Sequence, residues 1–229
     1  MGLLGALVGG GAMLLAAPTR VPAPERARIE TVVREYILAH PEVITDALRE
    51  LQSREVGKVV SANRPAFETP YAGAFGGNPA GDVTLVEFFD YSCGYCRTSV
   101  PIIDRLIAED RGLRVVYREL PVLGPNSQAA ARISLAAART GKYGAFHHQM
   151  FAAGRPEPAT LARVAAATGV GGAATSPEDQ VEIDRNTQLA DAIGVTGTPG
   201  FIVGDRVFGG AVGYDTLKKA IADTRAARR

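Results

Sequence analysis

The only two cysteines of the chain are Cys93 and Cys96, which are separated by two residues. An apolar run over residues 83–89 precedes them and predicts a buried strand, and residues 97–108 after them predict a helix. Cys93 is therefore expected at the helix N-terminus, where unpaired backbone N–H groups and the helix dipole stabilise a thiolate. A thiolate at this position can attack disulfide bonds in other proteins and be displaced again.

A structural disulfide and a metal site are the alternatives for this pair. A disulfide that closes so short a loop removes little chain entropy and would stabilise the fold weakly. Zinc prefers four ligands. The chain has no second cysteine pair, and its only other candidate ligands of this kind are three histidines. We therefore interpret Cys93 as the attacking thiol and Cys96, one helical turn later and less exposed, as the resolving thiol. Such a redox-active disulfide uses no metal and no other cofactor.

Glu87 lies inside the apolar run, six residues before Cys93. One interpretation is a carboxylate on an edge strand that faces water. The other, which we prefer, is a partly buried carboxylate that carries a proton to or from the resolving thiol. We expect the two neighbouring histidines, His147 and His148, to be a core and a surface residue of one helix, and not ligands.

Composition and the first residues indicate where the protein works. The formal net charge is +1, so no basic excess suggests a nucleic-acid partner. Residues 3–17 form an apolar run of about signal-peptide length that is too short for a comfortable membrane span, although no lysine or arginine precedes it. Residues 1–23 are predicted to be a cleaved signal peptide, with an uncleaved membrane anchor or a wrongly assigned start as alternatives. We expect a periplasmic or otherwise exported protein, where a cysteine pair can stay oxidised.

Residues 24–64 predict a pair of amphipathic helices that are separated at His40-Pro41. Each helix has charged residues on its other faces and an apolar face. The apolar residues are Ile29, Val32, Val33, Tyr36 and Ile37 in the first helix and Ile44, Leu48 and Leu51 in the second. This apolar stripe packs either on the main domain or against copies of the same chain, and we prefer the second interpretation.

The remaining elements predict an α/β fold. A connection rich in glycine, proline and asparagine over residues 67–82 leads into the main domain. The predicted order is strand, helix, strand, a helical block and then a hairpin and a last helix, over residues 83–89, 97–108, 113–120, 126–194, 200–209 and 214–225. That order is typical of a small mixed sheet with helices on its faces and a helical insertion.

The stretch Glu87-Phe88-Phe89-Asp90-Tyr91-Ser92-Cys93-Gly94-Tyr95-Cys96, with Thr198-Pro199 far downstream, resembles DsbA-type thiol:disulfide oxidoreductases of the thioredoxin superfamily. The resemblance covers residues 70–225 and implies a thioredoxin fold with a helical insertion over about 124–194. It also implies that Pro199 follows a cis peptide bond and packs beside Cys93, with Thr198 offering main-chain contacts to an extended substrate. Gly94 and Tyr95 are expected to join in substrate binding.

The N-terminal helices point to a subgroup. Residues 30–44 and 77–83 are similar to ScsC proteins, the suppressor-of-copper-sensitivity group. This resemblance implies a homotrimer formed through residues 26–62, exported protein substrates with thiols or disulfides, and a membrane thiol reductase or oxidase as partner. Three functions remain open: an isomerase or reductase, which we expect; a monomeric disulfide oxidase; and a copper-binding protein that uses the two soft thiolates for Cu(I).

Overall fold

The computed structural model describes residues 22–171 and 175–228. The chain divides into two compact units, Met1–Arg49 and Glu50–Arg229. Apart from residues 22 and 23, the expected signal peptide or anchor lies outside the described residues. Among the residues that are described, no helix combines the length and the apolar character that crossing a bilayer requires.

The described part of the first unit is helical. α1 (Ala23–Ala39) has Pro24 in its first turn and ends at His40, whose N–H bonds to the Tyr36 carbonyl. α2 (Glu42–Ala62), of which only the part up to Arg49 belongs to this unit, begins directly after Pro41, as expected from the restrictions that proline imposes on a helix interior. None of the α1 residues is buried, so its apolar side chains face water.

The second unit is built on a mixed five-stranded sheet in the order β1-β3-β2-β4-β5. The central strand β2 runs parallel to β3 and antiparallel to β4, and the outer strands β1 and β5 each pair antiparallel with their neighbour. The strands are β1 (Phe75–Gly77), β2 (Val83–Phe89), β3 (Leu113–Glu119), β4 (Gly200–Val203) and β5 (Arg206–Gly209).

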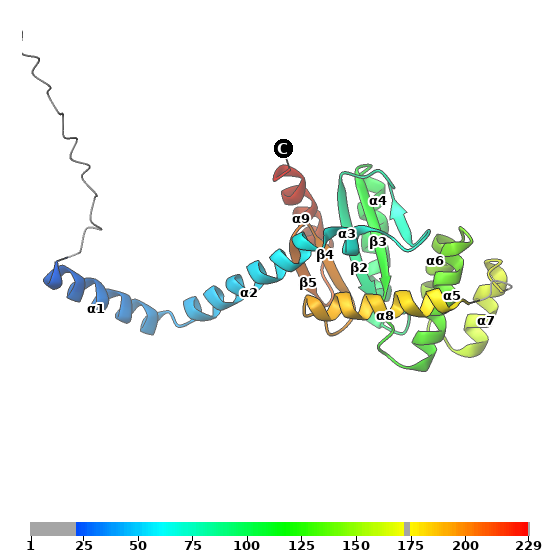
Figure 1. Ribbon diagram of the computed structural model, residues 1–229, viewed down its shortest axis with the longest axis horizontal. Helices are drawn as coiled ribbons and strands as arrows, with labels where there is room; N and C mark the ends of the chain where they lie inside the picture. Colours follow the sequence, from blue (N-terminus) through cyan, green and yellow to red (C-terminus); the bar gives the residue numbers. More distant parts are fainter. Residues whose placement is uncertain (1–21, 172–174, 229) are drawn as a thin grey trace, which may run out of the picture. The chain divides into compact units, whose positions relative to one another are not determined.

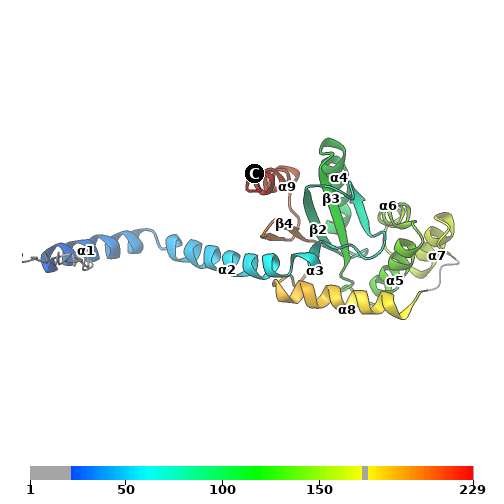
Figure 2. The ribbon, with the colours of Figure 1, turned by 45° about the horizontal axis from the view of Figure 1, so that its top comes forward.

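Helices cover both faces of the sheet, which confirms the expected α/β class (Figures 1 and 2). One face packs against α4 (Gly94–Glu109), α9 (Tyr214–Ala226) and α6 (Tyr143–Ala153). The other packs against α8 (Pro177–Ala192) and α3 (Arg64–Glu68). The expected helical insertion lies between β3 and β4, and besides α6 and α8 it holds α5 (Pro125–Arg139) and α7 (Pro158–Ala167).

This two-sided cover explains why all seven residues of β2 are buried. Because side chains alternate along a strand, Leu85, Glu87 and Phe89 point toward α4 and α6, whereas Val86 and Phe88 point toward α8. The active-site helix α4 follows β2 directly, so the end of the central strand sets the position of the two cysteines.

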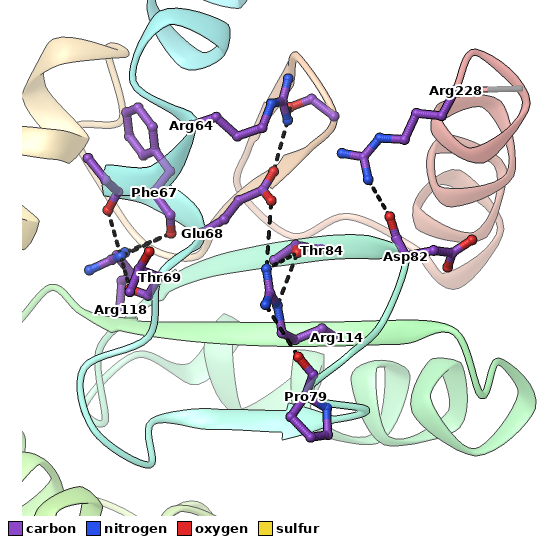
Figure 3. Close-up of polar contacts among 12 residues, drawn as sticks. Arg64, Phe67, Glu68, Thr69, Pro79, Asp82, Thr84, Arg114, Arg118 and Arg228 are labelled. Atoms are coloured by element: carbon purple, nitrogen blue, oxygen red, sulfur yellow. Dashed lines mark hydrogen bonds and ion pairs between the residues drawn. The ribbon is translucent and has the colours of Figure 1, made fainter.

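The predicted connection over residues 67–82 holds more structure than expected. Phe75–Gly77 forms the edge strand β1. Its Phe-Gly-Gly sequence does not predict a strand, because glycine is rare in strands. At the start of this connection, α3 ends at Glu68 beside β3. The Arg118 guanidinium donates to the carbonyls of Ala66, Phe67 and Thr69 at that helix end (Figure 3).

Candidate active site

The turn that follows β2 delivers Cys93 to the start of α4. Asp90 accepts hydrogen bonds from the N–H groups of Ser92 at 2.7 Å and Leu123 at 2.9 Å, and its carbonyl accepts the Cys93 N–H at 3.0 Å. Cys93 is the N-cap residue of α4, and its Sγ accepts the Cys96 N–H at 3.4 Å. The thiol therefore lies where the helix dipole favours a negative charge, as the sequence predicts.

A second loop approaches the same sulfur. The Thr198–Pro199 peptide bond is cis, as the family resemblance implies, and the Cys93 thiol lies 3.3 Å from the Thr198 carbonyl oxygen. The sheet fixes this loop, because the Pro199 carbonyl accepts the Gly210 N–H at 2.8 Å and Gly200 pairs with Phe88 of β2. Two motifs more than a hundred residues apart are thus brought together.

The two cysteines, both free thiols here, differ in environment. Cys96 is 0% exposed and Cys93 is 6% exposed, which matches the predicted order of access. Burial raises the pKa of the Cys96 thiol, and the negative charge of Glu87 raises it further. Cys96 thus holds its proton firmly unless a neighbouring base accepts it. Between them, Tyr95 is 67% exposed.

Glu87 lies at the centre of the sheet, where it pairs with Tyr117 of β3 and Phe201 of β4. The alternative of an edge-strand carboxylate facing water is therefore wrong. The side chain is 2% exposed. Burial raises the pKa of Glu87 well above its ordinary value, and a charge on Cys93 adds to the effect. A buried carboxyl whose pKa is raised in this way keeps a proton at pH values where an exposed carboxyl has lost it, which suits a proton carrier.

The two histidines take the expected core and surface positions on α6. His147 is buried among aromatic rings, and burial lowers its pKa to about 3, so the ring is neutral. His148 is half exposed and contacts Asp104. Within the described ranges, no three potential metal-ligating side chains come together.

Sequence reasoning missed two carboxyl groups of this site. Asp90 shapes the cysteine turn and is buried. Glu119, the last residue of β3, is also buried on the side of the sheet that carries Glu87. The alternation along residues 113–119 was a usable signal for Glu119, because it puts residues 117 and 119 on one face.

Comparisons with known proteins agree with this geometry. A family model of the DSBA-like thioredoxin domain matches residues 84–222, and a model of the copper resistance protein ScsC N-terminal domain matches residues 25–56. Two curated relatives, Na(+)/H(+) antiporters NhaA of Salinispora tropica and Salinispora arenicola, are 29% identical over 155 residues. The chain spans only 24% of the length of these relatives, and the antiporter names concern those proteins.

Among solved structures, a thioredoxin-like oxidoreductase from Silicibacter pomeroyi is 37% identical, with a TM-score of 0.68 over 72% of this chain and 98% of that one. A periplasmic thioredoxin-like protein from Salmonella enterica serovar Typhimurium is 28% identical, with a TM-score of 0.67 over 71% and 95%. A linker-deletion mutant of Proteus mirabilis ScsC shares the fold at 22% identity, with a TM-score of 0.73 over 92% and 100%. The chain belongs to the DSBA-like thioredoxin domain family.

Proposed function

We propose that this protein is a thiol–disulfide oxidoreductase that acts as an isomerase or reductase of exported proteins, and that Cys93 makes the attack. The Cys93 thiolate attacks a client disulfide, forms a mixed disulfide and releases one client thiolate. Another client thiol then displaces Cys93, which isomerises the client, or Cys96 does so, which reduces the client and leaves a Cys93–Cys96 disulfide. The observation that carries the proposal is the Cys93 thiol at the N-cap of α4, 3.3 Å from the Thr198 carbonyl.

Glu87 accepts the proton of the resolving thiol in this scheme. When Cys96 attacks, its proton moves to the Glu87 carboxylate, which is buried in the same core. Thr198 holds the client strand by main-chain pairing, with the cis Pro199 beside it. Gly94 and the exposed Tyr95 also contact the client.

Residues 26–62 serve as the oligomerisation segment in this proposal, and the oligomer is a homotrimer. Large apolar side chains of this segment are exposed, among them Val32, Tyr36, Leu38 and Leu48. Apolar side chains gathered on a helix at this density usually mark an interaction surface. The ScsC N-terminal domain model matches the same region. Several copies of Cys93 around one cavity suit an isomerase, which must rebind its client.

The proposed organisation follows from these assignments. Residues 1–23 direct export or anchor the chain, residues 24–64 form the helical segment, and residues 70–225 form the catalytic domain with its insertion over about 124–194. A membrane thiol reductase keeps Cys93 reduced outside the cytoplasm. A relative described as periplasmic supports the location.

Refolding of a scrambled disulfide client, together with sedimentation, tests the proposal. The wild-type chain should sediment as a trimer and restore client activity, and Cys93→Ser should not restore it. The double variant Val32→Glu, Leu48→Glu should dissociate the trimer and lose isomerisation while still reducing a small disulfide. The matched control Arg49→Glu changes an exposed charged residue of α2 and should remain trimeric. A monomer that only oxidises reduced clients would instead support a disulfide oxidase. Cu(I) binding by the reduced protein without any effect on the client would support the copper alternative.

A further inference from the structure

A second buried carboxyl lies close to Glu87. Glu119 ends β3, and the register pairs it with Phe89, two residues beyond Glu87 on β2. Because alternate residues share a face, Glu87, Phe89, Tyr117 and Glu119 lie on the same side of the sheet, and Glu87 and Glu119 are diagonal neighbours. Glu119 is 1% exposed.

The surroundings of Glu119 do not neutralise it. Among the described residues, its Oε1 has no hydrogen-bond partner. Its other contact is with Ser134 of α5, whose hydroxyl also lies 2.8 Å from the Tyr91 hydroxyl. Native proteins leave few buried polar atoms unsatisfied, so this oxygen calls for an explanation.

The titratable groups that face Glu119 come from four elements. β2 contributes Glu87, the cysteine turn contributes Asp90 and Tyr91, and α6 contributes Tyr143, with His147 beyond Tyr91. Tyr117 shares its own strand and face. His147 is neutral, so it offers no compensating positive charge. Burial raises the pKa of Glu119, the Ser134 contact opposes this, and the charges of Asp90 and Glu87 raise it further.

We propose that Glu119 is a positioning residue for the proton that Glu87 carries: the two buried carboxyls compete for one negative charge, and Glu119 thereby sets the pH at which Glu87 can accept the Cys96 proton. The inference rests on the proposed function, because it needs Cys96 as the resolving thiol and Glu87 as its base. Two like charges in one low-dielectric site are strongly disfavoured, so the pair loses its protons in two separate steps. While Glu119 carries the charge, Glu87 is protonated and cannot act as a base.

The step that this competition controls is the release of the mixed disulfide. The Cys96 proton moves to the Glu87 carboxylate, and the Cys96 thiolate attacks the Cys93 sulfur. The Cys93–Cys96 bond forms, the bond from Cys93 to the leaving sulfur breaks, and that sulfur departs as a thiolate with the electron pair. Cys93 and Cys96 are oxidised by two electrons, and the disulfide that was attacked is reduced.

An aromatic disulfide reagent that releases a coloured thiolate separates the two stages. Mixed with the reduced full-length protein, it gives a first release when Cys93 attacks and a second release when Cys96 resolves. We expect the rate of the second release to rise with pH as Glu87 ionises. In Glu119→Gln the midpoint of that rise should move to lower pH by roughly one unit, because the competing acid is gone. Glu119→Asp keeps an acid and should restore a midpoint near that of wild type.

Controls make the outcomes decisive. Glu68→Gln changes a largely buried carboxyl on the opposite face, paired with Arg64 and near Arg114, and should leave the midpoint unchanged. An unchanged midpoint in Glu119→Gln, or a shift to higher pH, overturns the inference. A second release that persists in Cys96→Ser overturns the proposed function instead.

A titration of the wild-type protein tests the same coupling without depending on whether a variant folds. Carbon-13 labelling of glutamate carboxyls allows both groups to be followed by NMR. We expect Glu87 and Glu119 each to titrate in two coupled steps, and Glu87→Gln to shift the Glu119 curve to lower pH. Two independent single-step curves would refute the coupling.

Discussion

The two faces of the central sheet both bury ionisable side chains, and they satisfy them very differently. On the face covered by α3 and α8, the Arg118 guanidinium is 1% exposed and makes six hydrogen bonds, including those to Glu182 and Asn186. On the face covered by α4 and α6, Glu87 and Glu119 are equally buried, and the Glu119 Oε1 has no partner among the described residues.

This difference indicates that the buried charge on one face has a structural role, whereas the buried carboxyls on the other face take part in the reaction. A buried charge whose donors are all paired holds elements together, and here it fixes the end of α3 and the middle of α8 against β3. A buried carboxyl without such partners has a high affinity for protons and little structural value. The face with the unsatisfied Glu119 oxygen is the one that holds Cys96, where a proton must be accepted during the reaction.

The largest effect is expected from Arg118→Met. This change leaves the buried Glu182 with only its longer, 3.7 Å contact to Arg185, and it removes the donor from the α3 carbonyls. The free energy of unfolding should fall by about 3–5 kcal/mol, as for other broken buried ion pairs. Chemical denaturation measures this loss. Adding Glu182→Leu should recover part of it, and a variant as stable as wild type would remove Arg118 from its structural role.

Glu87→Gln should give the next largest effect, mainly on the rate of the reaction. Without the base, the second thiolate release should slow by about a hundredfold. The folded-state pKa of Glu87 is raised, so its contribution to stability is complete below the ordinary carboxyl pKa of 4.5 and is lost as pH rises toward the folded value. The variant should therefore lose less stability than wild type between acid and neutral pH. An unchanged release rate would contradict the assigned role.

Ser134→Ala should give a smaller effect, on the face that holds Glu87 and Glu119. It removes the hydroxyl that lies 2.8 Å from the Tyr91 hydroxyl and that also contacts Glu119. The expected loss is about 1 kcal/mol of unfolding free energy, because Tyr91 keeps its contact with His147. Thermal unfolding measures this loss, and a loss as large as that of Arg118→Met would erase the contrast between the faces.

The smallest effect is expected at the exposed pair of His148 and Asp104, which lie 2.9 Å apart between α6 and α4. Partial burial favours the neutral ring, but the hydrogen bonds to Asp104 and the Gly144 carbonyl raise the pKa of His148. Its contribution is therefore present below the ordinary histidine pKa and is lost as pH rises through the folded value. Asp104→Asn should cost under about 1 kcal/mol at acid pH and nothing at alkaline pH. A pH-independent cost would show that protonation is not involved.

Local sequence signals located much of the fold and the central part of the site. The apolar run before Cys93 and the helical period after it predicted the position of Cys93 at a helix start. The family resemblance then placed the proline before the last hairpin, and with it Thr198, beside Cys93. The residues that were missed depend on contacts between distant segments. Arginine is usually exposed, so Arg118 gave no hint of burial under α3. The burial of Glu119 depends on α5 and α6, which pack on the sheet only in the folded chain.

Trapping a client on the active site tests the role of Cys93 most directly. In Cys96→Ser the resolving thiol is gone, so a client with one reactive disulfide should remain attached. We predict a mixed disulfide that mass spectrometry locates at Cys93 and that the double variant Cys93→Ser, Cys96→Ser does not form. Attachment through Cys96 in Cys93→Ser at the same rate, or client exchange that continues without Cys93, would contradict the assignment of Cys93 as the attacking thiol.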